Sequence, residues 1–423
     1  MNILMMTNTY LPHIGGVARS VEAFSRYYRN HGHKVLIIAP EFPQMPEDEE
    51  DVIRVPAIQR FNGSDFSVVL PVPHFLGEEI DAFEPDIVHS HHPFLIGSMA
   101  RLVAKKNNIP LVFTHHTMYE QYSHYVPVDA QTLQHFAVKL ATSYANMCDQ
   151  VFAPSESIAA VLQQRGVSTP IAVIATGVDL KEFACGSGLA FRQLIGMPED
   201  AFVVGHLGRL ATEKNLEYLS VAVQAFMEKQ PNAHFLLVGK GRAKRQLVDS
   251  FSESGLAARL HPIGFLEQPF LASAYQAMDA FVFSSQSETQ GMVVTEAMSA
   301  SVPVIALDAS GVREVVVDNY NGLLLATQAS TGEFAAALQS YFCLPKSKQQ
   351  EFRSAARTTA ETYSLDLCAE KALKKYSELL GNGYVHHHHE HQIWADVVSL
   401  IKAEYDILKG ITKAAVHAFT YKN

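Results

Sequence analysis

The sequence predicts an α/β protein made of two doubly wound domains, each a parallel sheet covered by helices on both faces. Three observations lead to this fold class. Short apolar runs alternate with segments of helical period, the alternation stops and restarts once, and the chain is 423 residues long. Strands separated by helical segments form parallel sheets. A chain of this length also exceeds one ordinary hydrophobic core.

The first series of strands occupies the N-terminal part of the chain. Helical segments are expected at residues 17–30, 97–106 and 134–145, where the apolar period changes from strand-like to helix-like. Six buried strands are expected at residues 3–6, 34–39, 86–89, 111–114, 150–153 and 172–174. This series predicts an N-terminal domain at residues 1–180.

The second series repeats the pattern and predicts a domain at residues 181–380. Turn residues between Thr176 and Met197 mark the join. The expected strands are 202–208, 234–239, 260–264, 280–284, 302–306 and 323–325. Ligands of open parallel sheets bind at the carboxyl ends of the strands. The two domains are therefore expected to face each other across a cleft that holds the site.

Helices are expected to dominate beyond residue 330, and residues 381–423 form a C-terminal extension. Its histidine-rich run, 386–391, is interpreted as a solvated link, with a metal-binding tract or a tag-like sequence as alternatives. The tail after it carries one apolar helical stripe. A helix packed on the domains is the preferred interpretation, and a helix lying on a membrane surface is the alternative.

Composition excludes several classes of function. The formal charge of −10 argues against a nucleic-acid partner, because phosphate backbones are bound by excess Lys and Arg. Four scattered cysteines without a Cys-x-x-Cys pair indicate free thiols in a reducing compartment. The N-terminus lacks a basic leader, and no run of eighteen apolar residues occurs. We expect a cytoplasmic protein, at most peripheral on the cytoplasmic membrane face. The acidic run 47–51 is interpreted as a solvated loop.

Two glycines, Gly15 and Gly16, follow the first expected strand and precede a helix. Paired glycines let backbone N–H groups approach a phosphate, and the helix N-terminus adds a positive dipole. A simple turn is the alternative for this motif taken alone.

The second domain begins in the same way but with more charge. Gly208 and Arg209 end its first strand, and Lys214 follows as a helix begins. Cationic donors at the carboxyl end of a strand can hold a diphosphate. No Asp-x-Asp metal motif is evident. Fixed cations are therefore expected to neutralise the leaving group without a metal or another cofactor.

A carboxylate pair, Glu288 and Glu296, follows another strand of this domain. Glu288 lies at a helix entrance, where its charge suits the dipole, and Glu296 lies on the second turn. A carboxylate accepts two hydroxyl hydrogen bonds at once, as sugar and ribose recognition requires. A capping glutamate plus an exposed helical glutamate explains the spacing equally well.

Residues 1 to about 380 resemble the retaining GT-B glycosyltransferases of family four, also called glycosyltransferases group 1. The resemblance implies that transfer is made from a nucleotide sugar and needs no metal. Many relatives have Phe-Gly after the first glutamate, whereas this chain has Thr289-Gln290, which indicates a subgroup and leaves the donor hexose open. The motifs that carry the resemblance are Glu288-x7-Glu296, Gly15-Gly16, Gly208-Arg209-Leu210 with Lys214, Val238-Gly239-Lys240-Gly241 and Gly264-Phe265-Leu266.

The family resemblance also implies a role for each motif residue. Arg209 and Lys214 contact the donor diphosphate, Glu288 binds hydroxyls of the donor sugar, and Glu296 binds the ribose. The remaining donor residues are expected to act through their backbone: Gly264 and Phe265 at the base, and Gly291, Met292 and Val293 at the sugar and phosphate.

The N-terminal half resembles lipid glycosyltransferases of the diacylglycerol glucosyltransferase type. Segments 86–94, 113–120 and 123–127 carry this similarity. His116 aligns with the family's active-site histidine near the anomeric carbon, so the catalytic set is His116, Arg209, Lys214 and Glu288. The acceptor is expected to meet His91, His92, Tyr119 and His124. The histidine spacing matches no closed zinc site, so hydrogen bonding is expected of these residues.

The expected function is retaining transfer of a hexose, from UDP-glucose or a similar donor, to a hydroxyl acceptor such as the lipid diacylglycerol. Donor binding is expected mainly in the C-terminal domain and acceptor binding mainly in the N-terminal domain. Two alternatives stay open. One is transfer to a soluble sugar or small molecule, and the other is a catalytically silent protein that binds a nucleotide sugar. The oligomeric state is not predicted.

Overall fold

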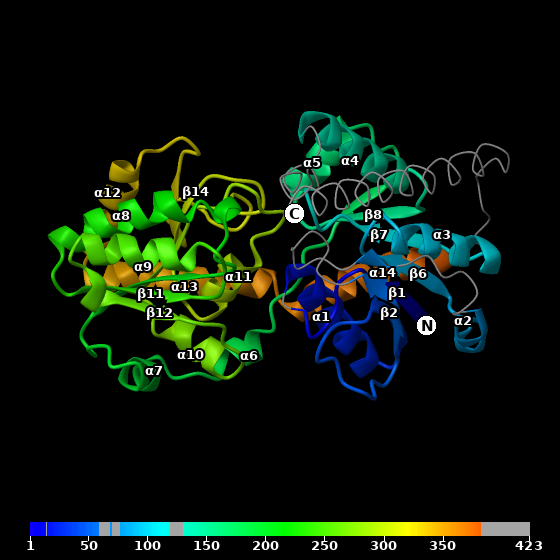
Figure 1. Cartoon of the computed structure of the whole chain (residues 1–423), viewed down its shortest axis with the longest axis horizontal. Helices are drawn as coiled ribbons and strands as arrows, with labels where there is room; N and C mark the ends of the chain where they lie inside the picture. The colour runs from blue at the N-terminus through cyan, green and yellow to red at the C-terminus, as the bar shows by residue number, and fades with distance from the viewer. Residues whose placement is uncertain (14, 59–67, 70–76, 119–129, 382–423) are drawn as a thin grey trace, which may run out of the picture. The chain divides into compact units, whose positions relative to one another are not determined.

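A computed structural model describes the chain except for residues 14, 59–67, 70–76, 119–129 and 382–423 (Figure 1). The described chain forms two compact units. The first comprises Met1–Ala175 together with the chain from Ala369, and the second is Thr176–Cys368. Each unit contains one large parallel sheet, so the predicted fold class of two doubly wound α/β units is confirmed.

The first unit is built on a seven-stranded parallel sheet. Its strand order is β3 (Val52–Val55), β2 (Lys34–Pro40), β1 (Asn2–Met6), β6 (Ile87–Ser90), β7 (Leu111–Thr114), β8 (Gln150–Ala153) and β9 (Ile171–Val173). A short antiparallel pair, β4 (Ala57–Ile58) and β5 (Val68–Val69), lies outside it. The helices of this part are α1 (Gly16–Asn30), α2 (Gly77–Phe83), α3 (Ile96–Asn107), α4 (Ala130–Ala145) and α5 (Glu156–Gln164).

All six expected strands of this unit form within two residues of their predicted ends. The side chains of the five inner strands are almost all buried on both faces of the sheet, as the continuous apolar runs require, and those of the edge strand β9 are half-buried. Strand β3 was not expected. It is a short edge strand whose residues are mostly half-buried, so its sequence carries a weak apolar signal.

The second unit is built on a six-stranded parallel sheet. Its strand order is β12 (Leu260–Ile263), β11 (Ala233–Val238), β10 (Phe202–Leu207), β13 (Ala280–Phe283), β14 (Val304–Leu307) and β15 (Gly322–Leu325). The surrounding helices are α6 (Leu180–Ala184), α7 (Gly188–Leu194), α8 (Leu216–Lys229), α9 (Lys244–Glu253), α10 (Phe270–Gln276), α11 (Met292–Ser299), α12 (Thr331–Phe342) and α13 (Lys346–Thr362), with short 3₁₀ turns at Thr212–Lys214 and Ala257–Arg259.

Two hydrophobic clusters cover the two faces of this second sheet. Successive residues of β10 alternate between them: Val203 belongs to one cluster and Val204 to the other. Figure 1 shows helices on both sides of the strands. All six strands expected for this part form where the sequence predicts them, within two residues.

Each sheet reverses its strand order beside its first strand. In the first unit β1 lies between β2 and β6, and in the second β10 lies between β11 and β13. Loops after the central strands leave the carboxyl edge in opposite directions at such a point and form a crevice for ligands. The candidate residues after β1, β6, β10 and β13 therefore follow the strands at these two switch points.

The C-terminal boundary differs from the expected one. Helix α14 (Leu365–Gly381) starts in the second unit, but the chain belongs to the first unit from Ala369 onward. Tyr376 explains this, because it is fully buried and its ring stacks on Phe152 of β8 at 5.9 Å between centroids. Its hydroxyl also lies 2.5 Å from Nδ1 of His89. The described part of the expected range 181–380 thus divides at Ala369, whereas residues 382–423 lie outside the described residues and the expected extension at 381–423 stays a prediction.

No helix among the described residues is long and apolar enough to cross a membrane.

Candidate active site

Lys214 and Glu288 lie together at the carboxyl edge of the second sheet. Lys214 ends the 3₁₀ turn that follows β10, and Glu288 lies in the loop after β13, the neighbouring strand. The Lys214 ammonium donates a hydrogen bond to Oε1 of Glu288 at 2.5 Å. Both side chains are largely buried, with 17% and 16% of their surfaces exposed. The sheet topology thus brings together two residues that the sequence placed in one site.

Glu288 is ionised at neutral pH despite its burial. Burial alone would raise the pKa of this carboxyl. The charge of Lys214, hydrogen bonds from Lys214 and Ser285, and the charge of Arg209 outweigh that effect, and the pKa of Glu288 is lowered. The site therefore holds a fixed carboxylate acceptor beside a fixed cation.

Arg209 forms a second ion pair, with Glu213. The guanidinium Nη2 lies 2.6 Å from the Glu213 carboxylate, on the same turn of chain. Glu213 is only 9% exposed, whereas 37% of the Arg209 side chain reaches solvent. Sequence reasoning missed Glu213, although its position four residues after Arg209 is the signal that could have found it. Each cation predicted to meet a diphosphate thus has a carboxylate beside it.

The Gly208 loop is held against the segment that follows β11. The Gly208 N–H donates to the Val238 carbonyl at 3.1 Å, and the Leu210 N–H donates to the Lys240 carbonyl at 2.8 Å. Gly239 has φ +139°, and a Cβ there would lie 1.9 Å from the Gly208 carbonyl oxygen. Only glycine permits this close approach, so the glycines of this motif set the position of Arg209.

Phe265 presents an aromatic face next to this loop. It follows β12, and 37% of its surface is exposed, which is high for a large apolar side chain. The Lys240 ammonium lies 6.0 Å from its ring centroid. Neighbouring Gly264 has only the Lys240 side chain within 4 Å of a would-be Cβ. An exposed ring with a cation beside it can accept a planar base.

The helix α11 carries the remaining donor residues. Gly291 caps its N-terminus at φ +68°, and Met292 and Val293 form its partly exposed first turn. Glu296 is only 3% exposed, and its Oε2 accepts a hydrogen bond from the Tyr275 hydroxyl at 2.7 Å. Glu296 is therefore a buried, oriented carboxylate, which differs from the exposed helical glutamate of the alternative interpretation. Sequence reasoning missed Tyr275, because nothing in its local pattern points to a partner on α11.

In the first unit, His91 and His116 lie edge to edge after β6 and β7. Nδ1 of His91 lies 2.9 Å from Nε2 of His116, and the ring planes are inclined by 24° with their centroids 5.2 Å apart. Nε2 of His91 is buried without a hydrogen-bond partner in the described chain. Burial and the charges of neighbouring histidines lower the pKa of both rings well below the usual value. The two neutral imidazoles therefore form one hydrogen bond, in which one ring nitrogen donates and the other accepts.

His92 has a defined tautomer. Its Nδ1 lies 3.0 Å from the backbone N–H of Asn8, which can only donate, so Nδ1 accepts and the proton resides on Nε2. Burial lowers the pKa of His92 to about 3, with a smaller effect from His13. His92 thus ties the end of β1 to the end of β6. Tyr119 and His124, the other expected acceptor residues, lie outside the described residues.

The Gly15–Gly16 turn precedes α1, as the sequence predicts. Gly15 is the N-cap residue, with extended backbone (φ −168°) and no side-chain cap. The loop before it is held by Arg54 of β3, whose Nη2 donates to the Leu11 carbonyl at 2.5 Å. The first backbone N–H groups of α1 therefore remain available for an anion.

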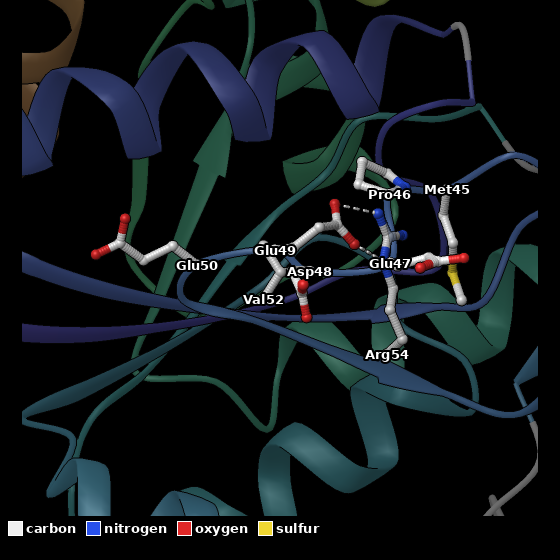
Figure 2. Close-up of a pocket in the computed structure, with 8 residues that line it drawn as sticks. All are labelled: Met45, Pro46, Glu47, Asp48, Glu49, Glu50, Val52 and Arg54. Carbon is white, nitrogen blue, oxygen red and sulfur yellow. Dashed lines mark hydrogen bonds and ion pairs between the residues drawn. The ribbon is translucent and has the colours of Figure 1, made fainter.

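The acidic run beside this loop is not wholly solvated. Glu49 accepts hydrogen bonds from Arg54 at 2.5 and 2.7 Å and is 14% exposed, while its neighbours are more exposed (Figure 2). Figure 2 shows Arg54 directed toward Glu49 across a surface hollow. Sequence reasoning missed Arg54, since it lies on the unexpected strand β3.

No group of three or more His, Cys, Asp or Glu side chains in the described chain could hold a metal ion. The expectation that transfer proceeds without a metal stays a prediction.

Two family models match the chain. The model described as Glycosyltransferase Family 4 matches residues 14–182, and that described as Glycosyl transferases group 1 matches residues 190–359.

Similar proteins of known name include two lipid enzymes. The alpha-monoglucosyldiacylglycerol synthase of Acholeplasma laidlawii is 31% identical over 341 residues, which is 76% of this chain and 84% of that protein. The protein of the same name from Streptococcus pneumoniae is 25% identical and covers 77% of this chain and 75% of its own length. A GDP-mannose-dependent alpha-mannosyltransferase of Mycobacterium tuberculosis is 27% identical over 90% of this chain and 97% of its own length.

Solved structures share the fold across about nine-tenths of the chain. HepE of Anabaena in complex with UDP superposes with a TM-score of 0.72 at 20% identity, covering 90% of this chain and all of that one. The sucrose-phosphate synthase of Thermosynechococcus elongatus superposes with a TM-score of 0.73 at 19% identity, covering 90% and 99%. The fold is GT-B, and the chain belongs to the group 1 glycosyltransferases with a family 4 N-terminal domain.

Proposed function

We propose that the chain transfers a hexose from a nucleotide-diphosphate sugar to a hydroxyl acceptor, with retention of anomeric configuration. The observation that carries the proposal is the buried Lys214–Glu288 pair at the switch point of the second sheet. It combines a cation suited to phosphate with a carboxylate suited to sugar hydroxyls in one rigid arrangement. Arg209 and the Gly208 loop adjoin it in the same unit.

The proposed chemistry depends on stabilising the leaving diphosphate. The bond from the anomeric carbon to the phosphate oxygen breaks, and the acceptor oxygen bonds to the same face of that carbon. The acceptor's hydroxyl proton moves to an oxygen of the departing phosphate. Arg209, Lys214 and the backbone of the Gly15–Gly16 turn neutralise the charge that develops there, without a metal. His116 acts as a neutral hydrogen-bonding group near the sugar.

Retention is supported by the names of the similar proteins. Two are named for alpha-glucosyl products, and the mycobacterial one is named for alpha-mannosyl transfer. Because nucleotide sugars such as UDP-glucose are themselves α-glycosides, an α product corresponds to retention.

A lipid acceptor, diacylglycerol or a similar molecule, is the preferred substrate. It is supported by the similarity to the two monoglucosyldiacylglycerol synthases and implies work at the cytoplasmic face of a membrane. UDP-glucose is the preferred donor. The mannosyltransferase covers more of the chain at similar identity, so GDP-mannose is the second candidate.

A donor panel tests this proposal. The purified chain is incubated with UDP-glucose, UDP-galactose or GDP-mannose, first alone and then with vesicles containing diacylglycerol or with soluble sugars. Released nucleotide and the anomeric configuration of the product are measured. We expect slow hydrolysis of UDP-glucose alone and faster release with the vesicles, giving an α-glucolipid. If only soluble sugars stimulate nucleotide release, the acceptor is a soluble sugar and not a lipid. If the nucleotide sugar binds but no nucleotide is released, the chain is a catalytically silent binding protein. A β-linked product would overturn retention.

Tyr275 offers a separate test of the proposed ribose contact. Tyr275→Phe removes the hydroxyl that orients Glu296 and keeps the ring. We expect the donor KM to rise about tenfold, the scale of a hydrogen bond to a charged group, with kcat little changed because the ribose is remote from the reacting carbon. Tyr341→Phe is the control, since its equally buried hydroxyl bonds only to the Asp279 carbonyl at 3.3 Å. Equal effects in both variants would mean that Tyr275 is structural.

A further inference from the structure

Gln290 lies in the loop between β13 and α11 that also carries Glu288, which we call the donor loop. Its side chain, however, hydrogen-bonds to a residue far away in the sequence of the second unit. Its side-chain Oε1 accepts a hydrogen bond from the Thr176 backbone N–H at 2.6 Å. Its Nε2 donates to the carbonyl of the same residue at 2.5 Å. The two residues are 114 positions apart. A side-chain amide can donate and accept side by side in this way at any pH near neutral.

Both partners are withdrawn from water. Gln290 is 5% exposed and Thr176 is 4% exposed. Without the amide, both hydrogen bonds that Gln290 makes to the Thr176 backbone would be lost in surroundings that largely exclude water. The side chain of Gln290 is therefore a buried structural contact that fixes the position of the Thr176 backbone.

The backbone of Gln290 is held from a second direction. Gly311 has φ +74°, and a Cβ at that position would lie 2.6 Å from the Gln290 nitrogen and 2.7 Å from its Cα. The loop that carries Glu288 and Gly291 thus packs on a glycine and hydrogen-bonds to Thr176. A displacement of this loop must move Thr176 or break both bonds.

Thr176 is the first residue of the second unit, and the segment that precedes the return to the first unit at Ala369 pairs with Val178, two residues further on. The Val178 N–H donates to the Tyr363 carbonyl at 2.9 Å, and the Leu365 N–H donates to the Val178 carbonyl at 3.0 Å. A Cβ on Gly177 would lie 2.3 Å from the Leu365 Cα. Two segments lead to and from the first unit, residues 176–178 and 363–365, and backbone hydrogen bonds join them within the second unit. Gln290 hydrogen-bonds to the first of these segments, at Thr176.

We infer that Gln290 is a positioning residue that couples occupancy of the donor loop to the paired chain connections at Thr176–Val178 and 363–365. The inference rests on the proposed donor site. A ligand that orders Glu288 and Gly291 also fixes Gln290 between them, and the amide passes that constraint to Thr176. Without the amide, Glu288 and Gly291 can still contact the donor, but their ordering no longer affects residues 176–178 and 363–365.

Amide hydrogen exchange with UDP as the probe, and GDP as the second probe, tests the coupling. In the unaltered chain we expect a saturating nucleotide to slow exchange about fivefold or more both in the donor loop and at residues 176–178. In Gln290→Met the loop should still be protected, while residues 176–178 should exchange equally with and without nucleotide. The KM for the donor should rise about tenfold, because the loop is no longer pre-positioned.

Two further variants complete the experiment. Gln286→Met makes the same side-chain change in the same loop, where an exposed Gln286 donates only to the Thr327 carbonyl at 3.1 Å, and should behave as the unaltered chain. Gln290→Glu keeps the acceptor for the Thr176 N–H and loses the donor, so it should be intermediate; it carries the test if the methionine variant does not fold. Undiminished protection of residues 176–178 in the position-290 variants would overturn this inference alone. Absence of any nucleotide effect in the unaltered chain would overturn the proposed function together with it.

Discussion

Lys214→Met is expected to lower kcat/KM by on the order of 10²-fold or more, the scale for losing one preorganised charge contact in a transition state. Methionine keeps most of the length of the side chain and its apolar stem, and it removes the ammonium. Under the proposed function, the departing diphosphate would then lose the cation that lies in the 3₁₀ turn after β10. Arg209→Ala should lower turnover by a similar factor. Steady-state kinetics with the donor established by the panel provide the measurement.

The same substitution leaves Glu288 buried without its partner. Breaking a largely buried ion pair from one side costs about 3–5 kcal/mol, because the remaining charge is uncompensated. The pKa of Glu288 should rise, since burial then acts without the opposing effect of Lys214. Lys214→Met with Glu288→Gln should therefore recover much of the lost stability in urea unfolding while activity stays low.

A surface cation separates these effects from a change in net charge. Arg245 on α9 is 93% exposed and forms a long ion pair of 3.7 Å with Asp249. Arg245→Met should leave kcat/KM and stability nearly unchanged. Turnover close to that of the unaltered chain in both Lys214→Met and Arg209→Ala would show that the leaving group is stabilised elsewhere.

The strands of both sheets could be predicted because a strand buried on both faces reads as a continuous apolar run. Ile3, Val88, Phe113 and Val204 are all fully buried, and each belongs to such a run. Strand β3 escaped because an edge strand with half-buried residues lacks that signal. Residues Ala369–Gly381 of helix α14 follow the second unit in the sequence but belong to the first, because the contacts of Tyr376 lie in the first unit, and no local pattern encodes those contacts.

Site residues could be predicted where they directly follow a strand. Their hydrogen-bond partners could not be predicted where those partners are distant in the sequence. Lys214 and Glu288 follow adjacent strands, so topology alone brings them close. The partners Tyr275 and Gln290 act across the fold on Glu296 and Thr176, and no local pattern encodes those contacts. The roles of the donor and acceptor residues still come from resemblance and remain predictions. Tyr119, His124 and the C-terminal tail lie outside the described residues.

Gly239→Ala is expected to disrupt the Gly208 loop without removing a charged residue. The new Cβ would lie 1.9 Å from the Gly208 carbonyl oxygen, which is backbone and cannot rotate away, at a φ of +139° that alanine rarely adopts. Strain of this kind costs about 1–3 kcal/mol before the steric clash is counted. We expect a total loss of stability on the order of 3 kcal/mol or more in urea unfolding, and UDP binding weakened about 10²-fold by calorimetry.

Gly255→Ala is the matched control, because it shares the positive φ, +72°, but has open space within 4 Å. It carries only the conformational penalty of about 1 kcal/mol and should bind UDP as the unaltered chain does. The difference between the two variants therefore reports the close approach of Gly239 to Gly208 together with the more restrictive φ of Gly239. If both variants lose stability equally and both retain UDP binding, the backbone of the Gly208 loop can shift to accept a methyl group. Arg209 would then owe its position to its ion pair with Glu213 rather than to the glycines beneath it.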